Sequence, residues 1–192
     1  MNNQWKEIVG YSLSAIGTMQ AAIGNTPQFH LNKNLGYQLR LVGNVLQALG
    51  SALSADGQGM DSFEKIGDEI QATGNSTVIT GMLVGDAWGE KIEQKLMITG
   101  LWMQALGSFV GLSDEFFDRT EDGRLENISG SLLQGIGNSL QAISGIQSLN
   151  ENNSESDLVG VAGSWIQATG SVLSLIGQIQ EESEEIHLNI NE

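Results

Sequence analysis

Apolar and polar positions recur with a seven-residue period along most of the chain, and a glycine marks each period. At 100° per residue, the second, third and sixth positions after such a glycine fall on one side of a helix. The pattern therefore predicts amphipathic helices whose broad apolar face packs into a core, with glycine bordering that face and glutamine just beyond it. We reject β structure because a period-two alternation is absent. The predicted apolar face carries Leu46, Leu49, Ile70, Trp102, Met103, Leu106, Leu133, Ile136, Trp165 and Ile166.

Capping residues and helix breakers divide this pattern into six predicted helices. Gly24 suits the end of the first helix, and the single proline of the chain follows it. Asp61 or Ser62 can cap the third helix, and Gly85 with Asp86 should separate the third helix from the fourth. The expected helices cover residues of about 4–23, 35–55, 62–84, 87–112, 125–149 and 157–180.

A second level of repetition groups the helices. The motif Gln-Ala-Thr-Gly at 71–74 recurs at 167–170, and Gly-Asn-x-Leu-Gln-Ala at 43–48 recurs at 137–142. We therefore predict an all-α fold, a six-helix bundle made of two tandem three-helix repeats with heptad glycine stripes. Residues 1–180 form a single domain in this prediction, with units of about 1–85 and 86–180. An acidic tail, frayed or paired as a short strand, follows at 181–192.

The regular spacing of glycine indicates close contact between helices. Glycine costs about 1 kcal/mol relative to alanine inside a helix, so a repeated glycine needs a structural reason. Small residues let two helix backbones approach each other. The predicted helix-contact stripe consists of Gly17, Gly43, Gly50, Gly67, Gly74, Gly100, Gly107, Gly130, Gly137, Gly163, Gly170 and Gly177.

Composition and charge restrict the classes of partner. The 192 residues carry a net charge of −15, which repels nucleic acid and anionic lipid surfaces. The chain has no cysteine, and its N-terminus lacks the pattern of a signal peptide, so a cytoplasmic location is expected. Three charge-free segments, 96–113, 127–150 and 158–179, are long enough to cross a bilayer. Their many polar residues and a mean hydropathy of −0.08 make a membrane location the less favoured alternative.

Glutamines recur beside the glycine stripe. They could bind a ligand or link subunits, but repetition in most helices favours a structural role, in which each amide bonds a neighbouring helix. The four tryptophans, Trp5, Trp88, Trp102 and Trp165, are interpreted as packing anchors between helices. The repeat glutamines are Gln47, Gln71, Gln104, Gln134, Gln141 and Gln167.

One segment resembles part of a calcium loop. Asp118, Thr120, Asp122 and Glu126 fall at the first, third, fifth and ninth positions, but Ser129 replaces the bidentate glutamate of the twelfth. This weak candidate competes with a simpler interpretation, an acidic turn in which Gly123 adopts a left-handed conformation.

Other chemistry finds no support in the sequence. The two histidines lie far apart, no phosphate-binding glycine loop occurs, and no serine sits in a nucleophile elbow. We therefore predict no catalytic residue, no metal, no cofactor and no enzymatic activity.

The repeated Gly-x-x-x-Gln-Ala-x-Gly motif, the opening Met-Asn-Asn-Gln-Trp-Lys-Glu-Ile and the closing segment 163–179 carry a family resemblance. Over nearly its whole length the chain resembles a family of uncharacterised repetitive proteins of Bacillus and relatives. The resemblance implies a bacterial source and adds no activity or functional residue. The favoured function is a non-enzymatic structural or protein-interaction module that binds a protein partner or itself, without nucleic acid. The alternative is a conditional membrane-active protein, either pore-forming or membrane-inserting.

Overall fold

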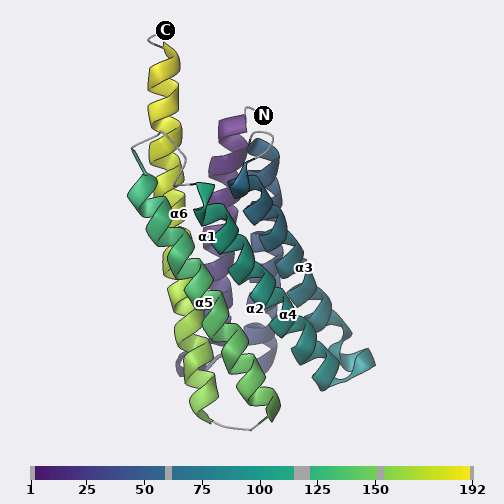
Figure 1. The fold of residues 1–192 in the computed structure, drawn as a ribbon. Coiled ribbons are helices and arrows are strands. Elements are labelled where there is room, and N and C mark those ends of the chain that lie inside the picture. The colour runs from purple at the N-terminus through teal and green to yellow at the C-terminus, as the bar shows by residue number, and fades with distance from the viewer. Residues whose placement is uncertain (1–2, 59–61, 115–121, 151–153, 191–192) are drawn as a thin grey trace.

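The computed structural model describes residues 3–58, 62–114, 122–150 and 154–190, and within them it contains helices and no strand. The predicted all-α class and the six-helix bundle are confirmed (Figure 1). A short 3-10 helix, η1 (Pro27–Phe29), lies between the first two α-helices. The helices are α1 (Asn3–Asn25), α2 (Lys33–Gly57), α3 (Phe63–Trp88), α4 (Glu90–Leu112), α5 (Arg124–Asn150) and α6 (Ser154–Ile190).

The helix ends differ from the prediction in two places. Ser62 caps α3 as predicted, because its side chain accepts a hydrogen bond from the backbone N–H of Lys65 at 3.0 Å. The break before α4 lies at Gly89 rather than at Gly85, because Gly89 has a φ of 90° that glycine tolerates. At the other end of the chain, α6 continues to Ile190, through most of the segment that was expected to be a frayed tail or a strand.

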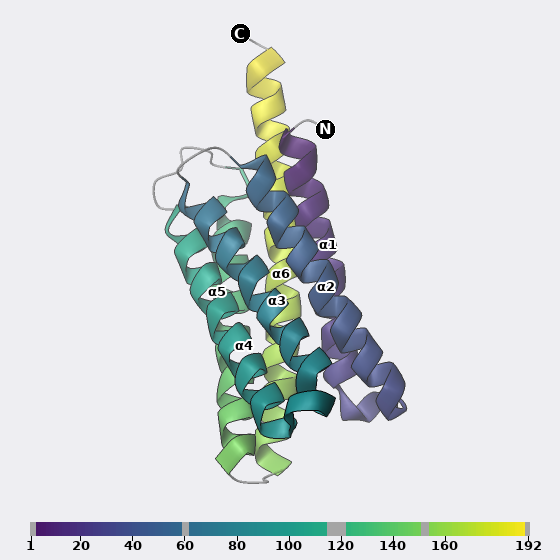
Figure 2. The same ribbon diagram turned by 90° about the vertical axis from the view of Figure 1, so that its right-hand side faces the viewer.

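Three antiparallel hairpins form the bundle. The helices pack most extensively in the pairs α1–α2, α3–α4 and α5–α6. Neighbouring hairpins pack through α2–α3 and α4–α5, and α1 packs against α6, which closes the six helices into a ring. The hairpins spread apart toward the end opposite the C-terminus of α6 (Figures 1 and 2). The pair α3–α4 spans the boundary that the sequence repeat placed between two three-helix units, so the closest packing follows hairpins instead.

Glycines bring the two helices of each hairpin into backbone contact. A Cβ atom added to Gly17 would lie 2.5 Å from the carbonyl oxygen of Gly43, and one added to Gly43 would lie 2.6 Å from that of Gly17. Such distances leave no room for any side chain. Equivalent facing pairs are Gly10 with Gly50, Gly67 with Gly107, Gly74 with Gly100, Gly130 with Gly170 and Gly137 with Gly163.

The interior is polar and the outer surface is apolar, which is the reverse of the predicted arrangement. Among the described residues, no Leu, Ile, Phe or Trp side chain is buried. The buried hydrophobic side chains are six alanines with Val78 and Met82, and the largest side chains that are fully buried are Gln178, Asn75 and Asn138. The predicted packing anchors Trp5, Trp88 and Trp102 are exposed, as are Leu49, Leu106 and Ile136 of the predicted core face. Trp165 does act as an anchor, because its ring lies against Phe29 and its Nε1 donates a hydrogen bond to Thr26 Oγ1 at 2.9 Å.

The glycine contacts explain this reversal. Helices that touch at their backbones cannot hold leucine or tryptophan between them, so the bulky side chains point outward. Serine, asparagine and glutamine are small or flexible enough to fill the remaining space, and they can pair their polar atoms with one another. The heptad pattern therefore predicted two faces for each helix but assigned the wrong face to the interior.

Candidate functional site in the polar interior

Four of the six repeat glutamines meet at the centre of the ring. Gln167 on α6 donates a hydrogen bond from Nε2 to Oε1 of Gln47 on α2 at 2.9 Å and a longer one to Gln104 on α4 at 3.4 Å. Its Oε1 accepts a hydrogen bond from Gln141 on α5 at 2.9 Å. Gln47, Gln104 and Gln167 are buried. This glutamine cluster crosslinks four helices and divides the interior into two parts.

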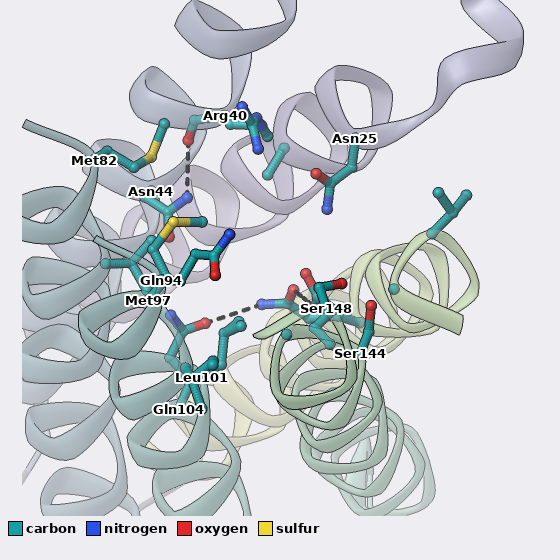
Figure 3. Close-up of a pocket in the computed structure, with 18 of the residues that line it drawn as sticks. Asn25, Arg40, Asn44, Met82, Gln94, Met97, Leu101, Gln104, Ser144 and Ser148 are labelled. Atoms are coloured by element: carbon teal, nitrogen blue, oxygen red, sulfur yellow. Dashed lines mark hydrogen bonds between the residues drawn. The ribbon is translucent and has the colours of Figure 1, made fainter. Parts of the chain in front are cut away.

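On one side of the glutamine cluster lies a cavity of about 270 Å³, named here the Arg40 cavity. All six helices contribute to its wall. Figure 3 shows Arg40 and Asn25 on one side, Met97, Leu101 and Gln104 on another, and Ser144 and Ser148 of α5 on a third. Its lining includes amides, hydroxyls, apolar side chains and one guanidinium.

The wall of the Arg40 cavity carries polar atoms that lack hydrogen-bond partners within the described residues. Nε of Arg40 and Nε2 of Gln104 are both buried without a partner. Burial lowers the pKa of the Arg40 guanidinium, and the negative field of Glu93 opposes part of that effect. The cavity therefore presents unpaired hydrogen-bond donors and a desolvated positive charge.

On the other side of the glutamine cluster, the interior is narrow and rich in hydroxyls. A cavity of about 30 Å³ is lined by seven serines from α1, α2, α4, α5 and α6, together with Tyr11, Asp68, Gln71 and Gln134. Gln134 donates a hydrogen bond to Oγ of Ser174 at 3.0 Å. The two remaining repeat glutamines thus lie in this second part of the interior, so all six repeat glutamines line the bundle axis.

Acidic residues gather at the end of the interior beyond the serines. The buried Gln178 donates hydrogen bonds to Glu7 at 3.1 Å and to Glu182 at 3.0 Å. Tyr11 donates a hydrogen bond to Glu64 at 2.8 Å, and burial together with Glu64 and Asp68 raises the pKa of Tyr11 well above its usual value. This acidic end lies opposite the Arg40 cavity along the bundle axis.

Asp68 is a buried carboxyl group of this acidic end. Burial raises its pKa to about 7, although hydrogen bonds from Ser54 and Gln58 favour the charged form. Nε2 of Gln58 lies 3.0 Å from Asp68 Oδ2. Asp68 therefore changes its charge near neutral pH.

The calcium-loop candidate lies partly outside the described residues, because Asp118 and Thr120 belong to the segment 115–121. Of its other members, Asp122 donates its backbone N–H to Glu184 at 3.1 Å, and Glu126 lies in the first turn of α5. Gly123 has a φ of 83°, which confirms the predicted left-handed glycine in this turn. The described residues contain no cluster of His, Cys, Asp and Glu that could hold a metal ion.

Arg40 and Asp68 were not recognised as site residues in the sequence. For Arg40 a signal existed, since it is the single charged residue between positions 34 and 55. A lone charge in the middle of a helix is costly unless it faces a polar region. Asp68 carried no such signal, because acidic residues at positions 64 and 69 surround it near a helix start, where acidic residues are common.

The Arg40 cavity can bind small polar species, since it presents donors, acceptors and a positive charge in a pocket that is partly open to solvent. Comparison with known proteins gives a family and no activity. The sequence profile of a family of unknown function (DUF6944) matches residues 5–175. No curated protein and no solved structure matches the chain. Because the matched segment covers most of the chain, the protein belongs to the family of unknown function DUF6944.

Proposed function

We propose that the protein is a membrane-inserting helical bundle whose apolar outer surface contacts lipid acyl chains. The observation that carries this proposal is the distribution of residues: glutamine, asparagine and serine fill the interior, and leucine, isoleucine and tryptophan cover the outside. A water-soluble bundle gains its stability by burying the second group. A bundle in a bilayer has no such need, and its polar side chains and close glycine contacts belong inside.

The distribution of charge supports a lipid-facing belt. Each helix has a middle segment without Asp, Glu, Lys or Arg, apart from the inward-lining Arg40 at the edge of the α2 segment, and the charged residues lie toward the helix ends. Helices α1 to α5 contain 23 to 27 residues, which at 1.5 Å per residue reach about 35–40 Å. The whole helices are thus longer than a hydrocarbon core of about 30 Å is thick, while the shortest charge-free segments, 41–55 and 70–85, cover about 23 Å of it. The charge-free segments are 8–32, 41–55, 70–85, 96–113, 127–150 and 158–180.

Exposed aromatic side chains lie at both ends of this belt. Trp5 and Phe63 stand at the starts of α1 and α3, and both are exposed. At the opposite end of the bundle, Phe29 of η1 follows the end of α1 and Trp88 ends α3, and both are exposed. Aromatic residues concentrate at the two membrane–water interfaces of membrane proteins, so these four residues suit interfacial anchors.

The mean hydropathy of the helices supports membrane insertion less strongly than the composition of their outer faces does. Within the described residues, one helix segment, Leu158–Glu184, is long and apolar enough to cross a membrane by length and composition, with a hydropathy of 1.3. An average over all positions includes the inward serines and glutamines, which lower it in every helix. The lipid-facing side chains, which decide the transfer energy, are mostly apolar.

The net charge makes insertion conditional. At neutral pH a charge of −15 opposes approach to an anionic bilayer. Most Asp and Glu side chains take up protons near pH 4, so acid weakens the repulsion. We therefore propose that the protein inserts into anionic membranes after acidification and into uncharged membranes without it.

The glycine stripes and the two-unit repeat of the sequence are also part of this proposal. The heptad glycine stripes would hold the hairpins together in lipid, and the two-unit repeat would reflect duplication of a three-helix segment. A Bacillus-type source stays a prediction from the resemblance. The competing function, a self-associating protein module, would cover the same apolar surface with further copies of the chain in place of lipid.

Flotation with liposomes tests the proposal. We expect the protein to float with phosphatidylcholine liposomes at pH 7.4, and with phosphatidylglycerol-rich liposomes at pH 4.5 but not at pH 7.4. Leu106→Lys, in the middle of the belt, should weaken association about 10- to 100-fold, because a charge within a bilayer costs about 2.5–3.5 kcal/mol.

The matched control is Leu125→Lys, which places the same charge on an exposed residue between Arg124 and Glu126 at the charged end of α5. It should float like the unmodified protein. If the protein stays in the aqueous fraction under all conditions and forms oligomers that Leu106→Lys disrupts, self-association is the function instead.

A further inference from the structure

Arg40 is a partly buried cation that forms no ion pair within the described residues. Its guanidinium makes no ion pair or hydrogen bond within the described residues, and burial lowers its pKa. Glu93 is near enough to favour the charge of Arg40 but forms no ion pair with it. A desolvated charge with no ion-pair partner is unfavourable, so its presence needs a reason. A negatively charged ligand in the adjoining cavity would supply the missing partner.

Gln104 points to the same conclusion independently. It is 2% exposed and lines the same cavity, and its Nε2 has no hydrogen-bond partner within the described residues. The other half of its amide is occupied, since Oε1 accepts the hydrogen bond from Gln167. Gln104 can therefore donate to a ligand without breaking the glutamine cluster. A ligand with acceptor oxygens would satisfy both Gln104 and Arg40.

The cavity also limits the size and polarity of the ligand. A volume of about 270 Å³ is smaller than a typical drug site and holds about ten non-hydrogen atoms. Met82, Met97 and Leu101 give the wall an apolar part (Figure 3), to which Ile98 also contributes. Since one guanidinium lines the cavity within the described residues, a monoanion balances the charge and a phosphate dianion does not.

We propose that the Arg40 cavity is a binding site for a small organic monocarboxylate, with Arg40 pairing the carboxylate, Gln104 donating a hydrogen bond and the methionine side of the wall contacting an apolar body. Guanidinium groups bind carboxylates through two parallel hydrogen bonds, which fits this role for Arg40. The inference goes beyond the proposed membrane insertion and does not depend on it, because it rests on the interior alone.

Binding can be measured with benzoate as the probe, on the full chain in whichever solution or detergent keeps it monodisperse. We expect benzoate to raise the melting temperature in a saturable manner and to give a binding isotherm by calorimetry. Benzamide, which has the same shape without the charge, and acetate, which lacks the apolar body, should each bind at least tenfold more weakly. These comparisons use the unmodified protein, so they hold even if a variant misfolds.

Variants locate the site. Arg40→Gln should weaken benzoate binding at least tenfold and should raise the melting temperature without ligand, because it removes an unpaired buried charge. Lys33→Gln removes an exposed positive charge from the same helix and should leave binding unchanged. The proposal is overturned if benzoate gives no saturable shift, if benzamide or inorganic phosphate binds as tightly as benzoate, or if Arg40→Gln binds benzoate normally.

Discussion

Replacing Gly107 with leucine should abolish stable folding of the α3–α4 hairpin. A Cβ atom at Gly107 would lie 2.5 Å from the carbonyl oxygen of Gly67 and 2.7 Å from Cγ of Gln71. Because the first obstacle is backbone, the two helices must move apart to admit even one methyl group. We expect Gly107→Ala to lower the free energy of unfolding by roughly 1–3 kcal/mol and Gly107→Leu to lower it by more. Chemical denaturation followed by circular dichroism measures both.

Gly111, four residues further along α4, provides the matched control. A Cβ atom there would meet no atom closer than Cα of Glu64 at 3.8 Å, which is ordinary contact. Gly111→Ala should therefore keep or raise the stability, by up to about 1 kcal/mol, since alanine is the better helix former. If Gly107→Ala proves as stable as Gly111→Ala, the close approach of the two helices is not a requirement of the fold.

Neutralising Asp68 should stabilise the protein at alkaline pH and have little effect in acid. The pKa of Asp68 is about 7 in the folded state, against an ordinary value of 3.8 that applies to the unfolded chain. The folded state therefore binds the proton more tightly than the unfolded state does. Stability linked to Asp68 is therefore greatest in acid and falls as the pH rises from about 4 through 7. At about 1.4 kcal/mol per pKa unit, the loss between pH 5 and pH 8 is about 2–3 kcal/mol.

Asp68→Asn removes this titration and leaves the size of the side chain nearly unchanged. We expect the stability advantage of the variant over the unmodified protein to grow by about 2–3 kcal/mol between pH 5 and pH 8, and to vanish near about pH 3, where Asp68 is protonated in both the folded and the unfolded state. All other ionisable groups are the same in both proteins, so the difference in stability between the variant and the unmodified protein isolates the contribution of Asp68. Glu69→Gln, at the exposed neighbouring position, should stay within about 0.5 kcal/mol at both pH values. An Asp68→Asn variant that is less stable at pH 8 would mean that the charged form supports the fold.

The sequence was sufficient to predict the helices but not which side of each helix faces inward. Caps and glycines are local signals, so the cap at Ser62 and the left-handed Gly123 were predictable. The choice of face used the rule that bulky apolar residues are buried, and Leu106 and Trp102 violate it. The spacing of Gly100 and Gly107 contained the contrary information, because a backbone in contact with another backbone excludes bulky side chains from between them.

The glutamines of the candidate site were predictable from the sequence, but Arg40, Asp68 and the spatial arrangement were not. The repeat glutamines were expected to be amides bonded to neighbouring helices, and Gln167 does contact Gln47 and Gln104. These glutamines contact one another only because α1 packs against α6 and closes the ring, and no local sequence pattern encodes that contact. The role of Arg40 could not be predicted for the same reason, since only the closed ring places this lone charge beside a cavity.

The accessibility of a nitroxide label on the outer surface tests the central claim most directly. The chain has no cysteine, so a single cysteine at Leu106 or at Leu125 can be labelled without competing thiols. In liposomes prepared under conditions of flotation, power-saturation measurements compare relaxation by oxygen, which concentrates in lipid, with relaxation by a water-soluble nickel chelate. Lipid contact predicts that the label at Leu106 responds mainly to oxygen and the label at Leu125 mainly to nickel. A label at Leu106 that responds mainly to nickel, or to neither agent, would contradict the proposal, because that residue would then face water or another protein surface.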